Sequence, residues 1–528
     1  MKYPIGFSSL LSDFALFALF LGWLTTPVVG APVPDPVGFL MPQVQEPQIP
    51  THTARITDFG AVSGGQVLCT AAISTGIDAL TAQGGGKLII PAGLWLTGPI
   101  VLRSDIELVV EQGALVQFTK DTKQYKGPAL IYGENLTNVA ITGRGVFDGG
   151  GEAWRPVKHA KMTEAAWKGL LASGGHLDAE TDIWTPPGVD GFRRPKMLVL
   201  SHCQRVLLDG TTFENSPSWN INPSFCDDVT IRNLIITNPY FAQNGDGLDL
   251  ESCRNVIIRG DRLDVGDDGL CMKSGVRGRQ GRGPAGGAAR PPNALRPTEN
   301  VLIENCVVYH AHGGFTIGSE MSGDVRNIWV NNCSFIGTDV GLRFKTQRGR
   351  GGVVERIYVT NISMTDIVTD AISFDMYYEQ KGGGGSAAKP VPVSDGTPQF
   401  RDLYIENIVC RGAQRAVQLQ GLPEMPIRGI HLKNVSITAD TGLVCEDARD
   451  ITMDHVEIIR RTGPVANFKT SHDVRIDQLG FGTGAPTLFR VEGGGNSGIA
   501  VSGTDLKGAG QALELAGSAD ASAIAIKQ

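Results

Sequence analysis

Short segments with an apolar residue at their second and fourth positions recur along most of the chain. This alternation is typical of a short strand with one buried face. Most of the segments end at Asn or Gly, which favour a turn. The segments are NVAITG (138–143), RVLLDG (205–210), DVTIRN (228–233), NVIIRG (255–260), NVLIEN (300–305), NIWVNN (327–332), RIYVTN (356–361), DLYIEN (402–407), GIHLKN (429–434), DITMDH (450–455) and DVRIDQ (473–478).

The spacing of these segments indicates a structural repeat. The starts at 205, 228 and 255 are 23 and 27 residues apart, and those at 300 and 327 are again 27 apart. A period in the twenties, with short strands and no helix in each repeat, fits a β-solenoid. A β-propeller would need a period of about 40–45 residues, and the Leu/Asn ladder of a leucine-rich repeat is absent. We therefore predict an all-β chain folded as a single β-solenoid with long loop insertions.

A second series of strands follows the first, with apolar residues at the first and third positions. Its members are LDLES (248–252), LCMKS (270–274), FTIGS (315–319), LRFKT (342–346), ISFDM (372–376) and VQLQG (417–421). In a solenoid, equivalent residues stack on successive turns at the ordinary strand spacing of ~4.8 Å. The segment 70–83 has apolar residues on one helical face and predicts an N-terminal capping helix. A helical piece at 163–173 would either pad the outside or wall one end of a groove.

The N-terminus has the pattern of an export signal. Lys2 precedes the apolar run FALFALFLGWL (14–24), and TTPVVGA (25–31) offers small residues for cleavage. We predict a signal peptide over 1–31, a Pro-rich linker over 32–53 and a catalytic β-helix over 54–528. An uncleaved membrane anchor is the alternative reading of the same run. No later segment has the ~18 consecutive apolar residues of a spanning helix, so we expect an exported protein without a membrane span.

Composition narrows the possible partners. The net charge of −7 argues against a general nucleic-acid binder. The nine cysteines form no C-x-x-C pair and have no Cys/His spacing suited to zinc, so no metal and no cofactor is expected. Nothing in the spacing requires a disulfide, and we expect a monomer.

Acidic residues take equivalent positions when the apolar residues that open the second strands are stacked. Those residues are Leu248, Leu270, Phe315 and Leu342. Asp246 and Asp268 then lie one turn apart, and Asp267 adjoins Asp268. An isolated Asp-Gly is most often a turn, but like charges one strand spacing apart destabilise a fold. A purely structural protein has little reason to concentrate that repulsion on consecutive turns.

An imidazole and two cations extend this row. His312 stacks on Asp267, and Arg343 and Lys345 share the strand face that points away from Phe344. Clustered carboxylates suit hydrolysis of a glycosidic bond, because neighbouring negative charge keeps one protonated as the acid while an ionised one activates water. The cations suit a substrate that bears carboxylates.

The motifs NGDG (244–247), GDDG (266–269), HGG (312–314) and RFK (343–345) together resemble the signature of the polygalacturonases, glycoside hydrolase family 28. Further resemblance lies in ITDFGAV (56–62), IPAGLWLTGPI (90–100), IGSEMSG (317–323), RGRGG (348–352) and GLPEMPI (421–427). The resemblance covers roughly residues 54–480. It implies a right-handed parallel β-helix that hydrolyses α-1,4-galacturonosyl bonds of pectin with inversion.

Carried over to this chain, the resemblance implies Asp267 as the general acid, supported by His312. Asp246 and Asp268 would activate the water. Asn244, Arg343 and Lys345 would bind substrate: Asn244 through local hydrogen bonds, and the two cations through galacturonate carboxylates.

The sequence departs from the family at three positions. Gly245 stands where Thr is usual, Gly269 where Cys is usual, and Asn222 where His is frequent. We expect altered loop packing at the glycines and a shifted subsite preference at Asn222, with activity retained.

Two features favour attack at chain ends: similarity to exo-acting bacterial members, and long insertions at 151–196, 276–298 and 380–398. Loops of this length can close one end of a cleft and so turn it into a pocket that accepts a chain end. Three alternatives stay open: a pectate-lyase-type β-elimination that uses calcium, hydrolysis of rhamnogalacturonan or xylogalacturonan, and a non-catalytic carbohydrate-binding solenoid.

Overall fold

The computed structural model describes residues 36, 38–189, 194–277, 295–378, 380 and 389–527. Contacts divide the chain into one unit over residues 1–37 and a second over residues 38–528. The expected signal peptide (1–31) lies outside the described residues, as do most of the insertion at 276–298 and the middle of that at 380–398. Among the described residues, no helix has the length and apolar character needed to cross a membrane.

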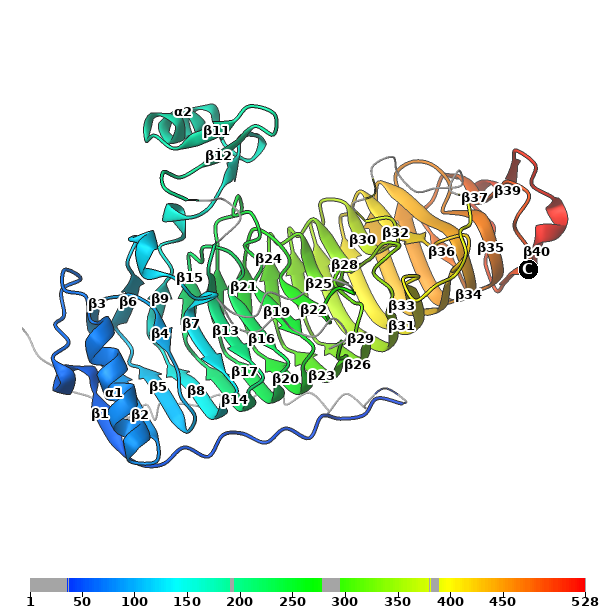
Figure 1. Cartoon of the computed structure of the whole chain (residues 1–528). Coiled ribbons are helices and arrows are strands. Elements are labelled where there is room, and N and C mark those ends of the chain that lie inside the picture. The colour runs from blue at the N-terminus through cyan, green and yellow to red at the C-terminus, as the bar shows by residue number, and fades with distance from the viewer. Residues whose placement is uncertain are drawn as a thin grey trace, which may run out of the picture. The chain divides into compact units, whose positions relative to one another are not determined.

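The second unit is a parallel β-helix, in which successive coils stack along one axis (Figure 1). Its wall has three faces, and each face is a ladder of parallel strands. The first face consists of β1 (Thr53–Arg55), β2 (Gly86–Ile90), β5 (Ile106–Val110), β8 (Thr137–Gly143), β14 (Gln204–Asp209), β17 (Asp227–Arg232), β20 (Arg254–Arg259), β23 (Thr298–Glu304), β26 (Val325–Asn331), β29 (Val353–Thr365), β31 (Gln399–Arg411), β33 (Ile427–Ala439), β34 (Thr441–Arg460), β35 (Ala466–Asp477), β38 (Ile499–Ser502) and β40 (Ile524–Ile526).

The second face begins near the N-terminus and is completed by the far ends of the long strands β29, β31, β33 and β34. Its own strands are β3 (Gly93–Thr97), β6 (Ala114–Phe118), β9 (Val146–Asp148), β15 (Thr212–Glu214), β18 (Ile235–Thr237), β21 (Arg262–Asp264), β24 (Val307–Tyr309), β27 (Ser334–Ile336) and β36 (Gly480–Phe481).

The third face carries the second series of strands and is joined by the first parts of β34 and β35. Its own strands are β4 (Ile100–Val101), β7 (Ala129–Glu134), β13 (Lys196–Ser201), β16 (Ile221–Ser224), β19 (Leu248–Glu251), β22 (Leu270–Lys273), β25 (Gly313–Gly318), β28 (Val340–Lys345), β30 (Asp370–Asp375), β32 (Arg415–Gln420), β37 (Ala485–Glu492) and β39 (Ala509–Ala516).

The predicted repeat is confirmed by strand register. The second residues of all the first-series segments pair in one unbroken ladder from Val139 through Val206 and Val229 to Val474. The residues that open each segment and those that close it have positive φ angles, for example 57° at both Asp228 and Asn233. Asn, Asp and Gly tolerate this left-handed conformation, which explains why they bound the strands.

Aromatic rings fill much of the interior of the coil. Phe344 stacks on Phe374 with centroids 4.2 Å apart, and Phe315 meets Phe344 edge-on at 6.2 Å. All three rings are fully buried. Stacking of equivalent apolar residues on successive coils therefore builds one continuous core and holds the coils in register.

The N-terminal end of the coil is covered by the predicted helix. Helix α1 spans Thr70–Ala82 and buries Ile73, Ile77 and Leu80. The prediction of a capping helix is confirmed.

Residues 38–52 run along the outside of the coil before β1 begins (Figure 1). The Leu40 amide donates to Asn327 Oδ1 (3.1 Å), and Asn327 Nδ2 donates back to the Leu40 carbonyl (2.9 Å). Phe39 packs edge-on against Trp329 at 5.4 Å. The described part of the Pro-rich stretch is thus docked on the coil. The predicted boundary between linker and catalytic domain remains a prediction.

The insertion between β9 and β13 folds as a small substructure that projects from the coil (Figure 1). It contains β10 (Val157–Lys158), α2 (Glu164–Ala172), β11 (His176–Asp178) and β12 (Ile183–Thr185), and its strands pair antiparallel in the order β10–β12–β11. Val157, Trp167 and Trp184 form its own small core. Helix α2 confirms the helical piece expected at 163–173, with Thr163 as N-cap.

Candidate active site

The register of the third face brings the three predicted carboxylates together. Leu248 pairs with Leu270, Leu270 with Phe315 and Phe315 with Leu342, as the stacking of the apolar positions predicts. Asp246 precedes β19, and Asp267 and Asp268 precede β22. One carboxylate oxygen from each of the three lies within 4.8 Å of one from each of the others.

Asp268 is anchored by two cations. Its Oδ1 accepts from Arg343 Nη1 (2.9 Å) and from the Thr316 hydroxyl (3.2 Å), and its Oδ2 accepts from Lys345 Nζ (2.6 Å). The Asp268 side chain is only 1% exposed. Burial by itself would raise the pKa of Asp268, but the nearby charges of Lys345 and Arg343 hold it well below its ordinary value. Asp268 is therefore a fixed, ionised carboxylate.

Asp267 is the accessible member of the group, with 19% of its side chain exposed. Its Oδ1 lies 3.1 Å from His312 Nδ1 and accepts from the Asp268 amide at 3.0 Å. Burial would raise the pKa of Asp267, but the hydrogen bond with His312 and the charges of His312 and Lys345 together lower it below its ordinary value.

Asp246 differs from Asp267 in its burial and in the direction of its pKa shift. Its side chain is 4% exposed and lies 3.6 Å from Lys273 Nζ. Its Oδ1 has no hydrogen-bond partner among the described residues. Burial, followed by the negative charges of Asp249 and Asp267, raises the pKa of Asp246 well above its ordinary value. Of the three carboxyls, Asp246 is therefore the one whose pKa is raised, while the pKa values of Asp267 and Asp268 are lowered.

His312 is held between Asp267 and the insertion. Its Nδ1 faces Asp267, and its Nε2 lies 3.2 Å from Lys161 Nζ. Because a lysine ammonium can only donate, Nε2 accepts and Nδ1 carries the proton that is donated to Asp267. In the neutral imidazole, Lys161 thus favours the tautomer with the proton on Nδ1, although Asp339 Oδ2 also lies 3.7 Å from Nε2.

Sequence reasoning missed two charged residues on the same face. Asp249 is fully buried, and Lys273 Nζ lies 3.1 Å from its Oδ1. Asp249 shares the outward-pointing ladder of Thr316 and Arg343. The alternation that identified Arg343 and Lys345 also applies to LDLES and LCMKS, so the signal was present in the sequence. Burial, offset in part by Lys273, raises the pKa of Asp249 to about 6.

The insertion contributes two further cations that no periodicity could have indicated. Lys161 lies in the short 3-10 turn His159–Lys161, and Arg194 follows α2 and β12 on the way to β13. Burial lowers the pKa of Arg194 to about 10, against the raising effects of Asp246 and Asp267. Arg194 Nη2 donates to Asn244 Oδ1 (2.9 Å). The predicted binding residue Asn244 is thus tied to Arg194 and is exposed.

Aromatic rings accompany the cations on both sides of the carboxylates. Trp219 lies between Lys196 Nζ and Lys273 Nζ, at 3.8 and 4.1 Å from its centroid. Tyr378 lies 4.8 Å from Lys345 Nζ. A ring beside a cation suits a ligand that combines the apolar face of a sugar ring with a carboxylate.

The departures from the family pattern are accommodated by close packing. A Cβ on Gly245 would lie 2.7 Å from the Ala242 Cβ, and one on Gly269 would lie 2.5 Å from Val308 Cγ1. Neither position has room for a side chain in the present packing of these loops. Asn222 accepts from Lys196 Nζ at 2.7 Å, so its amide orients a cation of the site.

The three carboxylates are also the one group among the described residues with a spacing that could hold a metal ion. Calcium prefers several oxygen ligands that are free to coordinate it. Both oxygens of Asp268 are already taken by Arg343 and Lys345, and Asp246 faces Lys273. These three carboxylates are therefore poorly suited to coordinate a divalent cation.

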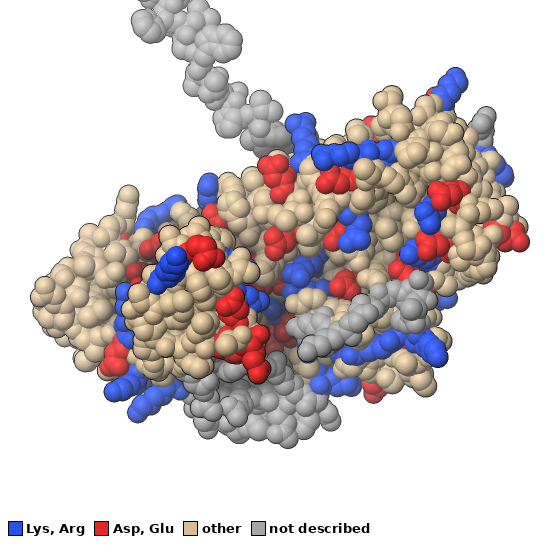
Figure 2. Space-filling model, turned by 90° about the horizontal axis from the view of Figure 1, so that it is seen from above, with Lys and Arg blue, Asp and Glu red and all other residues tan. Residues whose placement is uncertain are grey.

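The charge of the site is local. On the face seen in Figure 2, acidic and basic side chains are interspersed, with no broad region of one sign. A polyanionic substrate would therefore be recognised by the few cations within the site rather than by a general field.

Comparison with known proteins identifies the family. The family described as Glycosyl hydrolases family 28 matches residues 158–461, somewhat more than half of the chain. A probable polygalacturonase from Vitis vinifera is 29% identical over 415 residues, covering 73% of this chain and 74% of its own length. An endo-polygalacturonase from Pectobacterium carotovorum is 25% identical over 389 residues, covering 70% of this chain and 85% of its own length.

Among solved structures, an exopolygalacturonase from Thermotoga maritima is 27% identical, with a TM-score of 0.60. The alignment covers 83% of this chain and 93% of that one. Relatives of both exo and endo type therefore resemble this chain.

Proposed function

We propose that this chain, which belongs to glycosyl hydrolase family 28, is an exported polygalacturonase that releases galacturonate from chain ends with inversion of configuration. Membership makes it a glycoside hydrolase of the polygalacturonase family. The observation that supports the proposal best is the group of three carboxylates with oxygens within 4.8 Å of one another, of which one is accessible and another contacts Arg343 and Lys345.

Asp267 is assigned as the general acid because it is the accessible carboxyl of the three. A leaving-group oxygen can approach its exposed edge, whereas Asp246 and Asp268 are 4% and 1% exposed. A general acid must come within about 2.6–3.2 Å of the oxygen that it protonates. The hydrogen bond from His312 orients the Asp267 carboxyl for that contact.

The proton must reach Asp267 when substrate binds. A sugar ring over the site desolvates Asp267, and its galacturonate carboxylate adds negative charge beside it; both effects raise the pKa of Asp267. In the proposed mechanism, a proton then passes to Asp267 from Asp246, the carboxyl of the cluster with the raised pKa. The same transfer leaves Asp246 ionised, as a base that activates water needs to be.

Asp246 and Asp268 are assigned to hold and deprotonate the attacking water. The acid Asp267 and each of these two residues have a pair of carboxylate oxygens within 4.8 Å of each other, whereas the carboxyl groups of an inverting pair usually lie ~6.5–9.5 Å apart and those of a retaining pair ~5–5.5 Å apart. Direct attack by Asp268 is disfavoured because Arg343 and Lys345 occupy its oxygens. Direct attack by Asp246 is disfavoured by its burial. Water is thus the better nucleophile, and inversion follows.

The stereochemistry can be tested by proton NMR of the first product formed. Inversion of an α-linked galacturonan gives the β-anomer first, followed by mutarotation. Appearance of the α-anomer first would show retention and would require a covalent intermediate on one of the carboxylates.

The cations are assigned to galacturonate carboxylates. Arg343, Lys345, Lys161 and Arg194 lie around the three acidic residues, and Lys196 and Lys273 flank Trp219 on the side of the earlier coils. Hydrogen bonds between cations and carboxylates are among the stronger polar contacts in proteins. Arg343 and Lys345 keep their contacts with Asp268 and would share their remaining N–H groups with a substrate carboxylate.

Exo action is supported by the insertion at 151–196, which brings Lys161 to His312 and so reaches the catalytic residues. The test is the product profile on polygalacturonate. Monomer from the first minutes supports exo action, whereas a ladder of oligomers means endo action.

Export follows from the nature of the substrate and from the sequence pattern of 1–31. Pectin lies outside the cell, and an apolar run with a cleavage pattern precedes the catalytic region. Sequencing the N-terminus of the secreted protein tests the proposed cleavage after Ala31, and light scattering tests the proposed monomer. Retention of the run in the mature protein would indicate a membrane anchor instead.

A calcium-dependent lyase on the same fold would yield unsaturated products that absorb in the ultraviolet. Release of reducing ends without that absorbance, unaffected by a calcium chelator, supports hydrolysis. A non-catalytic binding role would be supported if Asp267→Asn behaved like the wild type.

A further inference from the structure

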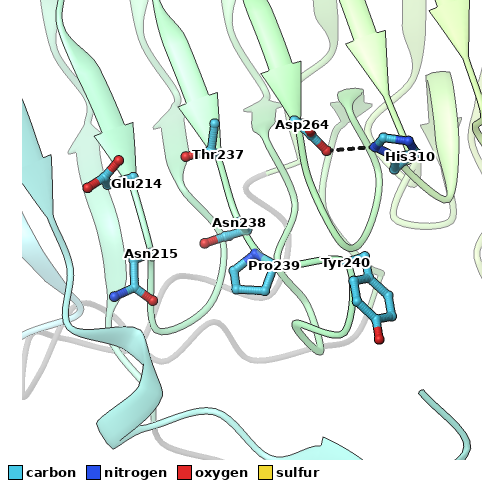
Figure 3. Close-up of a pocket in the computed structure, with 8 residues that line it drawn as sticks. All are labelled: Glu214, Asn215, Thr237, Asn238, Pro239, Tyr240, Asp264 and His310. Atoms are coloured by element: carbon cyan, nitrogen blue, oxygen red, sulfur yellow. Dashed lines mark hydrogen bonds and ion pairs between the residues drawn. The ribbon is translucent and has the colours of Figure 1, made fainter. Parts of the chain in front are cut away.

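A pocket of about 470 Å³ lies at the second face, beside the loops that carry the catalytic residues. It is lined by Glu214, Asn215, Thr237, Asn238, Pro239, Tyr240, Asp264 and His310 (Figure 3). Glu214, Thr237 and Asp264 are strand neighbours on successive coils, so their side chains form one row. Pro239 and Tyr240 belong to the loop that leads from this face toward Asp246.

The pocket shares its loops with the catalytic residues. Asp264 lies three residues before Asp267, and an extended chain spans at most about 11 Å over that distance. His310 lies two residues before His312. Tyr240 Oη donates to the carbonyl of Lys161 at 2.9 Å. A sugar chain bound at Asp267 could therefore place a neighbouring or attached sugar in this pocket.

The residues that line the pocket include carboxylates but none of the lysines and arginines that accompany the carboxylates of the catalytic site. Glu214 and Asp264 contribute carboxylates to it, and Asp148 adjoins Glu214 on the previous coil. Asp264 Oδ1 lies 3.0 Å from His310 Nδ1 (Figure 3), so Glu214 is the lining carboxylate on which the argument rests. Burial, followed by the charge of Asp148, raises the pKa of Glu214. In the described part of the chain the Glu214 side chain has no hydrogen-bond or ion-pair partner. An anionic galacturonate would be repelled here.

The same lining suits a neutral sugar. Ionised carboxylates only accept hydrogen bonds, and sugar hydroxyls can donate them. Tyr240 is 58% exposed and offers an aromatic ring beside these acceptors, and the volume lies within the usual range for small-ligand sites. Small-ligand sites typically place a small number of polar groups around an aromatic surface.

We propose that this pocket binds a neutral sugar carried as a branch on the galacturonan chain, so that the enzyme prefers a branched galacturonan. The proposal rests on the galacturonan hydrolysis proposed above. It assigns Glu214 as the residue that distinguishes a neutral branch from galacturonate.

The experiment compares kcat/KM on linear polygalacturonate with kcat/KM on galacturonan that carries single xylose branches. The wild-type enzyme should favour the branched substrate at least tenfold, since hydrogen bonds to a charged group contribute ~1.5–3 kcal/mol and 1.4 kcal/mol is tenfold. Glu214→Ala should remove this preference and leave linear turnover within twofold. Glu214→Gln, which keeps an acceptor oxygen, should retain part of it.

Glu457→Ala is the matched control, because Glu457 lies on the second face far along the coil, at β34. Its kinetics should match the wild type on both substrates. A methyl-esterified, unbranched galacturonan is the second control. If it gained the same Glu214-dependent advantage, the pocket would respond to loss of backbone charge, and the branch proposal would be overturned.

The same kinetics distinguish failure of the branch proposal from failure of the polygalacturonase proposal. If linear polygalacturonate is hydrolysed and branches give no advantage, or the advantage survives Glu214→Ala, the branch proposal is wrong while the polygalacturonase proposal stands. If neither substrate is hydrolysed, the proposed function itself fails.

Discussion

Lys345→Met should destabilise the protein by about 3 kcal/mol at pH 7. Lys345 Nζ lies 2.6 Å from Asp268 Oδ2, and the two side chains are 7% and 1% exposed. Removing one partner of a buried ion pair typically costs about 3–5 kcal/mol, because the remaining charge stays buried. Arg343 still contacts Asp268 at 2.9 Å, so the lower end of that range is expected.

Lys433→Met supplies the matched control. Lys433 Nζ pairs with Glu406 at 3.5 Å, but the two side chains are 54% and 39% exposed. Exposed pairs contribute about 0–1 kcal/mol. Urea unfolding followed by tryptophan fluorescence should therefore separate the two variants by roughly 2 kcal/mol or more, as the difference between those two ranges implies.

The effect of pH on the stability difference between Lys345→Met and the wild type follows from the pKa of Asp268. The folded-state pKa of Asp268 lies well below the ~3.9 of an unfolded chain. Its ionisation therefore stabilises the fold above about pH 4, and this stabilisation is lost as the pH falls toward the folded-state pKa. Lys345→Met raises that pKa, so the difference between variant and wild type should shrink from pH 7 to pH 3.

Two outcomes would refute this reasoning. One is an equal loss of stability in Lys345→Met and Lys433→Met. The other is an undiminished effect of Lys345→Met in an Asp268→Asn background, where the buried negative charge that Lys345 offsets is no longer present.

Three further predictions concern the catalytic residues. Asp267→Asn should lower kcat by roughly 10²–10⁴ while calorimetry shows unchanged binding of oligogalacturonide, since only proton transfer is lost; weakened binding would contradict the assignment. Lys161→Met should lower kcat/KM on polygalacturonate at least tenfold by loss of a charged hydrogen bond, whereas Lys168→Met, on the exposed side of α2, should not. Asp246→Asn should raise the melting temperature at pH 8 but not at pH 4. The folded-state pKa of Asp246 exceeds the unfolded ~3.9, so its ionisation opposes folding as the pH rises; equal shifts at both values would contradict this.

The fold was predictable because one pattern repeats. An apolar residue at every second position allows a strand only one buried face, and a one-residue slip would expose that face. The ladder from Val139 to Val474 shows that this constraint sets register over most of the coil. The same constraint placed Asp246 and Asp268 on neighbouring coils before any coordinates were needed.

The charged residues around these carboxylates were predictable only in part. Asp249 and Lys273 lie at alternate positions of their strands and follow the same rule as Arg343 and Lys345. Lys161 and Arg194 come from an insertion without periodicity. Their approach to His312 and Asn244 depends on how that insertion packs, through Trp167 and Trp184, and on where it leaves the coil.

The sequence by itself determined which residues stack, because strand alternation is a local property that each short segment carries. It thereby determined the all-β coil, its capping helix and the meeting of the three carboxylates. Only the tertiary structure decided in which direction the pKa of each carboxyl shifts. Burial and the charges of Asp249, Lys273, Lys345 and Arg343 act through space, and they raise the pKa of Asp246 while lowering that of Asp268. The acidic pocket beside the site has the same origin, since its walls join strands and loops whose distances no local pattern specifies.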